Sequence, residues 1–315
     1  MKKITIIGAG NGGVTAAYHF SKQGLRVCLY DHPDFSQQID AINENRGIQA
    51  LEGQNDTDFI LSGKSEIEEA STSIEKALAF SNILVMIVPA FAQEIMFKSM
   101  LPFLTEKHLL LSMPGNYAGL VLDRVKRENG YEHLDITYAD AMTIPWACRL
   151  FEPGVIGIMG IKKFIYVGVF PAHRAENVIN TLNEFFPIPV KLLKNVIEAG
   201  LENINFGGHP LVTTLNMGLL ENFKGQFNYY SDCVSPATDR VSAKKSRYIT
   251  EDVPNILVPC YEFATMLGIK VPIIESCIHI ASAFNDTNYF LEGRTLASMG
   301  LSALSKNEIL KYIGS

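Results

Sequence analysis

The glycine-rich stretch "KITIIGAGNGG", residues 3–13, constrains the fold more than any other part of the chain. An apolar run ends at Gly8, and apolar residues at helical spacing follow Gly13. In such a loop Gly8 permits a tight turn, Gly10 lets the backbone approach a pyrophosphate, and Gly13 lets the helix pack closely on the sheet. A strand, this loop and a helix begin a βαβ unit, which predicts a parallel sheet covered by helices.

The same alternation of apolar runs and helical segments continues through the first half of the chain. Further strands are expected in "LRVCLYD", "SNILVMIVPA", "HLLLSMPG" and "LDITYAD", and residues 154–170 predict an antiparallel pair at the sheet edge. From about residue 190 the segments have helical spacing. We therefore expect an α/β fold with a Rossmann-like, doubly wound parallel sheet in residues 1–188 and an all-α domain in residues 189–315.

The composition excludes several classes of protein. With 315 residues, of which 47% are hydrophobic and 19% charged, the chain can bury substantial cores and is not disordered. A net charge of −6 without a basic arm argues against a nucleic-acid partner, and no segment approaches the ~20 apolar residues of a membrane span. The five cysteines form no C-x-x-C pair, which favours reduced thiols in the cytoplasm, and no His or Cys spacing predicts a metal.

An acidic residue marks the end of the second predicted strand. Asp31 lies 18 residues beyond Gly13, where a carboxylate can accept hydrogen bonds from the adenosine ribose and repel a 2′-phosphate. NAD is therefore expected as the cofactor, with NADP disfavoured. The other predicted cofactor contacts come from the glycine loop and from the carboxyl end of a later strand: Gly8, Gly10, Asn11, Gly12, Gly13, Pro89 and Ala90.

Two further stretches carry chemistry. "DAMTIPWACR", residues 140–149, holds the chain's one tryptophan, and it offers the Thr143 hydroxyl and the Arg149 guanidinium to a substrate carboxylate. In "GGHPLVTTLN", residues 207–216, the glycine pair is expected to end one helix and Pro210 to begin the next, so that His209 sits at a helix start. Well-packed bends are the plainer interpretation of both stretches.

Together these stretches resemble the octopine/nopaline (opine) dehydrogenase family, whose NAD(P)-dependent enzymes pair a Rossmann domain with an all-helical domain. The resemblance runs in the family's order along nearly the whole chain. The similar segments are "GAGNGG" at 8–13, "MTIPWACR" at 142–149, "GGHPLVTTLNMG" at 207–218, "RYITEDVPNILVP" at 247–259 and "NDTNYFLEGRTLASMGLSALS" at 285–305.

The resemblance implies an activity and roles for particular residues. It implies NADH-dependent condensation of the amino group of an L-amino acid with a 2-oxo acid such as pyruvate, giving a secondary amine dicarboxylate. It places the family's catalytic histidine on His209 and its partnering aspartate on Asp286. Asn205 and Thr213, each about one helical turn from His209, would join the substrate network. Asp140 departs from the family pattern, which has Glu near this position. A homodimer through the helical domain is compatible with the same picture.

Two alternatives remain open at the level of sequence. One is a ketopantoate-reductase-like or glycerol-3-phosphate-dehydrogenase-like enzyme, which would rely on a lysine near the start of the helical domain, where Lys191 and Lys194 lie. The other is a non-catalytic, dinucleotide-sensing protein. Replacing His209 and Lys194 separately by Ala discriminates between the two enzymes, because turnover should be lost only with the catalytic residue.

Overall fold

The computed structural model describes residues 2–52, 60–215 and 245–314, and these form two compact units. Unit 1 runs to Ala199 and includes the chain end from Leu310, whereas unit 2 covers Gly200–Ile309. The division therefore falls later than the expected boundary at residue 188. The reason is a short strand, β12 (Val190–Leu192), which extends the sheet of unit 1 by pairing in parallel with its neighbour.

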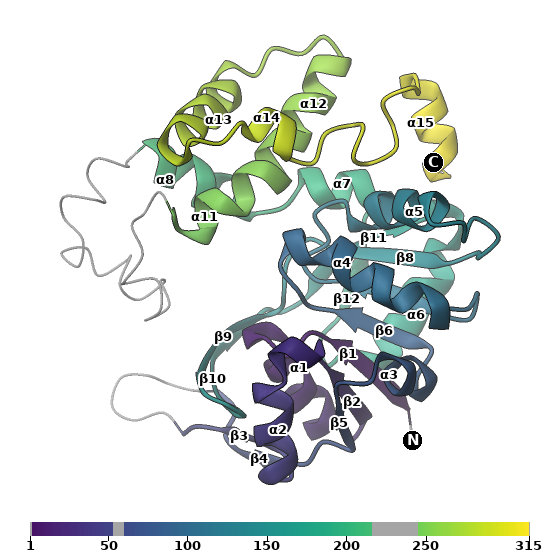
Figure 1. The fold of residues 1–315 in the computed structure, drawn as a ribbon, viewed down its shortest axis with the longest axis vertical. Coiled ribbons are helices and arrows are strands. Elements are labelled where there is room, and N and C mark those ends of the chain that lie inside the picture. Colours follow the sequence, from purple (N-terminus) through teal and green to yellow (C-terminus); the bar gives the residue numbers. More distant parts are fainter. Residues whose placement is uncertain (1, 53–59, 216–244, 315) are drawn as a thin grey trace. The chain divides into compact units, whose positions relative to one another are not determined.

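The main sheet of unit 1 has eight strands in the order β12-β11-β8-β7-β6-β1-β2-β5 (Figure 1). The five pairings from β5 across to β8 are all parallel, whereas β11 is antiparallel to β8. The expected doubly wound parallel sheet is thus confirmed, with two reversed strands at one edge. The strand bounds are β1 (Lys3–Ile7), β2 (Arg26–Tyr30), β5 (Glu69–Ser71), β6 (Ile83–Met86), β7 (Leu109–Ser112), β8 (Thr137–Ala141) and β11 (Ile165–Phe170).

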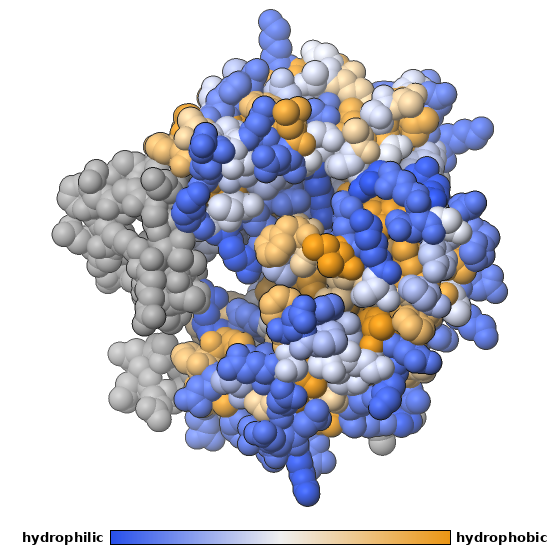
Figure 2. Space-filling view, in the orientation of Figure 1, coloured by the Kyte–Doolittle hydropathy of each residue, from blue (hydrophilic) through white to orange (hydrophobic). Residues whose placement is uncertain are grey.

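Helices connect and cover these strands. Their bounds are α1 (Asn11–Lys22), η1 (Pro33–Phe35), α2 (Gln37–Glu44), α3 (Ile74–Phe80), α4 (Ala90–Met100), η2 (Leu101–Phe103), α5 (Ala118–Glu128), η3 (Ala172–Arg174) and α6 (Ala175–Phe185). On α4, Phe91 and Ile95 are each 70% exposed, and Figure 2 shows hydrophobic side chains gathered over this helix on an otherwise mostly polar face.

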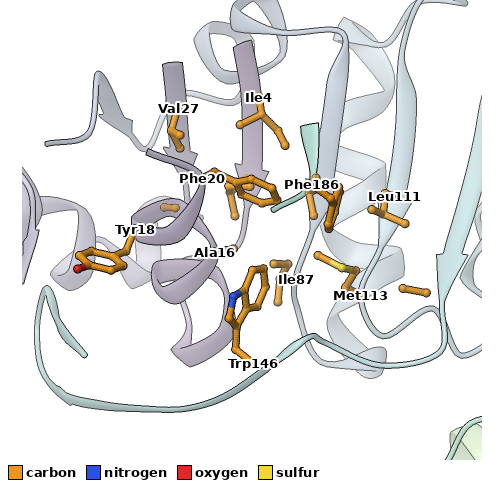
Figure 3. Close-up of a cluster of buried hydrophobic side chains, with 14 of the residues drawn as sticks. Ile4, Ala16, Tyr18, Phe20, Val27, Ile87, Leu111, Met113, Trp146 and Phe186 are labelled. Carbon is orange, nitrogen blue, oxygen red and sulfur yellow. The ribbon is translucent and has the colours of Figure 1, made fainter. Parts of the chain in front are cut away.

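The core of unit 1 lies between the sheet and α1 (Figure 3). Phe20 from α1 packs edge-to-face on Phe186, which follows α6, with ring centroids 5.0 Å apart. Ile4 and Val27 from adjacent strands are buried against them. These apolar residues recur every second position in the strands and at helical spacing in α1, which is why the sequence specifies this layering.

A second, smaller sheet packs against α1 and was not anticipated. Its order is β4-β3-β10-β9, built from β3 (Ile48–Ala50), β4 (Gly63–Ser65), β9 (Trp146–Glu152) and β10 (Val155–Ile161). The expected antiparallel pair within residues 154–170 is therefore wrong, because β10 pairs with β9 and β3 while β11 joins the main sheet. The connection that holds Lys162 thus passes from one sheet to the other.

In the described part of unit 2 the regular secondary structure is helical, with loops and turns between the helices. Its elements are the end of α7 (Val196–Leu201), η4 (Gly207–Leu211), α8 (Val212–Leu215), α11 (Arg247–Thr250), η6 (Val253–Leu257), α12 (Val258–Met266), α13 (Pro272–Asn285), α14 (Tyr289–Glu292) and the start of α15 (Lys306–Ile313). Its core joins Ile249, Leu257 and Val258 to Cys277 and Ile278 of α13. Among the helices of the described ranges, none is long and apolar enough to span a membrane.

Candidate functional site

The glycine loop follows β1 and has the geometry that the sequence predicts. Gly8 has φ +101°, and a Cβ on it would lie 2.6 Å from the carbonyl oxygen of Ile87. A Cβ on Gly13 would lie 1.8 Å from the carbonyl oxygen of Gly8, so only glycine allows this approach of helix and strand. Gly10, in contrast, has no atom within 4 Å of its Cβ position. The loop is therefore closed toward the protein and open at Gly10, at the start of α1, where a pyrophosphate can be held.

Asp31 directly follows β2 and is tied to the same loop. One carboxylate oxygen accepts a hydrogen bond from the Ala9 amide at 2.8 Å, and the other accepts from the His32 amide at 2.8 Å. Burial is the largest influence on this group and raises the pKa of Asp31, while the two amides partly offset it. The carboxylate is thus fixed at the strand end, where ribose hydroxyls would donate to its remaining lone pairs.

The other predicted cofactor residues lie around the same edge of the sheet. Asn11 donates from Nδ2 to the Cys148 carbonyl at 3.0 Å, and its buried Oδ1 has no partner in the described part of the chain. A Cβ on Gly12 would lie 2.9 Å from the Ile87 side chain. Pro89 and Ala90 begin α4 immediately after β6, with Ala90 buried. The carboxyl ends of β1, β2 and β6 therefore form one edge, as expected for a dinucleotide crevice.

The segment after β8 crosses this edge toward α1. Its Ile144 side chain lies 3.7 Å from the Cβ position of Gly12. Trp146 donates from Nε1 to His19 Nδ1 of α1 at 2.9 Å. Thr143, only 8% exposed, accepts a hydrogen bond from the Lys162 ammonium. Arg149 lies on β9 and donates from Nη1 to the Cys148 carbonyl at 2.8 Å. The structure thus places the Thr143 hydroxyl beside the Lys162 ammonium, whereas Arg149 lies farther along the chain, on β9.

Asp140, which departs from the family pattern, is buried behind this segment. Its carboxylate accepts from the Gly119 amide, with both oxygens at 3.1 Å from the nitrogen. Gly115 packs on it so closely that a Cβ would lie 2.3 Å from the Asp140 Cβ. Asp140 therefore binds the first turn of α5, where a negative charge is favourable.

In unit 2, His209 lies inside a helix and not at a helix start. Residues 205–215 are continuously helical, and Gly207–Leu211 form a π-turn with Pro210 inside it. The expected break at the glycine pair is therefore wrong. The wider π-turn accommodates Pro210, which has no backbone N–H to donate, and the two glycines give the backbone the conformational freedom to widen there. Such π-turns are frequent at functional sites.

The carboxylate that binds His209 belongs to Asp252. His209 Nδ1 and Asp252 Oδ2 are 2.8 Å apart. Asp252 is 8% exposed, and this burial raises the pKa of its carboxyl group against the opposing influence of His209. Asp252 precedes a second π-turn, η6. The Tyr248 ring stacks on the imidazole with centroids 3.9 Å apart and planes 21° apart.

The expected pairing of His209 with Asp286 is thus corrected to a pairing with Asp252. Asp286 ends α13 in the left-handed conformation, at φ 51°, and it lines a surface pocket with His279, Ser282 and Phe290. The sequence analysis missed Asp252 although its segment, "RYITEDVPNILVP", was among the similar stretches. An acid two residues before a proline, in a segment of family likeness, was the available signal.

The remaining predicted residues are spread over both units. Asn205 lies in the helical turn before His209, and Thr213 is fully buried in α8. Lys191, which the alternative enzyme classes would use, has its ammonium 3.6 Å from the centre of the Phe164 ring, and Lys194 immediately precedes Asn195 at the start of α7. In the described residues no cluster of His, Cys, Asp or Glu could hold a metal ion.

Comparison with known proteins connects the two units to one family. The family model for the α-helical domain of NAD/NADP octopine/nopaline dehydrogenases matches residues 192–244 and 241–285. The model for the N-terminus of NAD-dependent glycerol-3-phosphate dehydrogenase matches residues 3–115, so that likeness is confined to unit 1.

Similar proteins cover the whole chain. An opine dehydrogenase of Arthrobacter sp. (strain 1C) is 24% identical over 358 residues, covering 96% of each chain. The vitopine synthase of Allorhizobium ampelinum is 22% identical over 98% of each chain. An octopine dehydrogenase solved in complex with NADH and agmatine has the same fold, with a TM-score of 0.72 over 100% of this chain and 98% of the other at 15% identity. The chain is thus similar over nearly its whole length to opine dehydrogenases, and its residues 192–285 match the helical domain of that family of NAD-dependent oxidoreductases.

Proposed function

We propose that the protein is an NADH-dependent opine dehydrogenase that joins an L-amino acid to a 2-oxo acid. The observation that carries the proposal is the 2.8 Å contact between His209 and the buried carboxylate of Asp252. A histidine–carboxylate pair whose carboxylate is buried contributes little to stability, because burying a charge is costly. It is a good proton-transfer device, because histidine titrates near neutral pH.

The reaction follows from the two substrates. The amine attacks the carbonyl carbon of the oxo acid, water leaves, and the resulting C=N bond is reduced to a secondary amine. The bound nicotinamide supplies the hydride for the last step. One amino acid, one 2-oxo acid, one NADH and one proton give one secondary amine dicarboxylate, one NAD and one water.

The residues of unit 1 fit NAD. The cradle that is open at Gly10 and the helix start behind it suit a pyrophosphate. Asp31, held by two backbone amides, suits a ribose with free hydroxyls and disfavours one that carries a 2′-phosphate. We therefore assign the cofactor contacts to Gly8, Gly10, Asn11, Gly12, Gly13, Asp31, Pro89 and Ala90.

His209 would act as the acid and base of the condensation. The ionised Asp252 accepts from Nδ1–H of the neutral imidazole, which leaves Nε2 free to take a proton from the attacking amine. The same nitrogen then returns the proton to the departing hydroxyl. The Tyr248 ring stacks on the His209 imidazole and would fix its orientation, and with it the direction in which Nε2 points.

Substrate contacts stay predictions from the sequence. The candidates are Thr143, Arg149, Asn205 and Thr213. The homodimer also stays a prediction. Of these residues, Thr143 is the best placed in unit 1, at the sheet edge that would hold the nicotinamide.

The test is oxidation of NADH by the purified protein with pairs of amino acids and 2-oxo acids, beginning with pyruvate. The expected result is oxidation that requires both components and is lost in His209→Ala but kept in Lys194→Ala. Equal rates with the oxo acid alone would show a hydroxy-acid dehydrogenase instead. Binding of NADH without oxidation by any pair would favour a dinucleotide sensor.

A further inference from the structure

Lys162 has an unusual environment for a lysine. It lies between β10 and β11, where its amide donates to the Pro145 carbonyl at 2.9 Å. Its ammonium donates to Oγ1 of Thr143, and within the described ranges it takes part in none of the ion pairs. The neighbouring Lys163 is also exposed but makes no comparable hydrogen bond among the described contacts.

The ammonium end of Lys162 has lost part of its hydration, and no described residue gives it a negative partner. Burial around this end lowers the pKa of Lys162, although much of the side chain remains exposed to solvent. An ammonium has three donors, and Thr143 accepts one of them. An anion that accepts hydrogen bonds from the other two N–H groups would replace the hydrogen bonds to water that burial removes. Such charge-assisted hydrogen bonds are stronger than those between neutral groups.

Thr143 lies two residues beyond the carboxyl end of β8, at the sheet edge where dinucleotides bind in folds of this kind. Thr143 follows β8, and β8 is three strands away from β1 in the sheet order. The segment that holds Thr143 also reaches Gly12 through Ile144, so Thr143 lies close to the expected dinucleotide site.

Two arginines that could also bind a substrate carboxylate, Arg149 and Arg247, are less suitably placed in the described structure. Arg247 is bound by Glu251, with its Nε 2.6 Å from the carboxylate. Arg149 donates to a carbonyl of its own strand. A third, Arg240, lies outside the described residues.

We propose that Lys162, together with the Thr143 hydroxyl, binds the carboxylate of the 2-oxo acid. The inference rests on the proposed function and deepens it, because it names the group that orients the carbonyl substrate. The alternative anion with the same chemistry is a phosphate of the dinucleotide, and in that case Lys162→Met would weaken NADH binding instead of raising the KM of pyruvate.

The test compares Lys162→Met and Lys162→Arg with the matched control Lys163→Met in the full-length protein. Lys162→Met should raise the KM of pyruvate about 10- to 100-fold, the range for a lost charge-assisted hydrogen bond. Lys162→Arg should restore much of the affinity. Lys163→Met should leave KM unchanged. The KM of the amino acid and the affinity for NADH should change little in all three.

Equilibrium binding separates this inference from the proposed function. NADH binding is followed by the fluorescence of Trp146, the one tryptophan, and oxamate, a non-reducible isostere of pyruvate, is titrated into the NADH complex. Oxamate binding that weakens in Lys162→Met but not in Lys163→Met supports the site even if turnover is absent. Unchanged oxamate binding, no oxamate binding by the native protein, or weaker NADH binding with unchanged pyruvate KM would each overturn it. Native protein that is inactive with every substrate pair would instead overturn the proposed function.

Discussion

Replacing Asp252 by Asn tests which carboxylate acts with His209. The substitution keeps the shape of the side chain and removes the charge that lies against an imidazole nitrogen at 2.8 Å. The centres of the two charges are about 4 Å apart when the ring is protonated, which corresponds to about 4 kcal/mol at an effective dielectric constant of about 20. Since about 1.36 kcal/mol changes a rate tenfold, kcat should fall about 100- to 1,000-fold.

The matched control is Asp286→Asn, at the residue that the family resemblance had suggested. Asn tolerates the left-handed conformation that Asp286 adopts at φ 51°, so the end of α13 should persist. Both variants are assayed at saturating NADH, amino acid and pyruvate, with NADH affinity checked by the fluorescence of Trp146. The reasoning is refuted if Asp286→Asn loses kcat by this amount while Asp252→Asn keeps it.

Three further predictions concern the cofactor loop and the stability of the pair. Gly10→Ala should weaken NADH binding with little change in Tm, because no protein atom lies within 4 Å of its Cβ position. Gly13→Ala should lower Tm, because its Cβ would lie 1.8 Å from the Gly8 carbonyl oxygen. Calorimetry and NADH titration of both variants check these expectations. Asp31→Asn should narrow the preference for NADH over NADPH, measured as the ratio of their KM values, because the charge that repels a 2′-phosphate is removed. The raised pKa of Asp252 means that the folded state binds its proton more tightly than the unfolded chain, whose value is near 3.8, so ionisation costs stability as pH rises above that value. The difference in Tm between Asp252→Asn and the native protein should therefore shift in favour of the variant as pH rises from 4 to 7, and a shift in the opposite direction would contradict the assignment of burial as the main cause.

The sequence predicted those features that local chemistry determines. The glycine loop, the strand before it and the acidic residue after β2 each follow from the requirements of one turn or one strand end, and the structure has all of them. The sequence also predicted the change from alternating strands and helices to helices alone. The expected boundary at residue 188 lies before β12, which still belongs to the main sheet. A strand of three residues has too few positions to show a period.

Features that depend on distant contacts were not readable. The partner of His209 lies 43 residues downstream, and nothing in the spacing of the two residues distinguishes Asp252 from other acids. The π-turn at Gly207–Leu211 was hidden because glycine and proline ordinarily end helices. The second sheet joins β3 to β10 across about a hundred residues, and single strands of this length do not specify their partners.

The most direct measurement of the central claim is the fate of the hydride and of the nitrogen. The protein is supplied with pyruvate, an amino acid labelled with ¹⁵N and NADH deuterated on its transferable position, and the products are identified by mass spectrometry. The account predicts one product that contains both carbon skeletons, the ¹⁵N and one deuterium. Its mass should equal the summed masses of the two substrates, minus one water, plus one deuterium and one hydrogen. Deuterated lactate together with unchanged amino acid would contradict it.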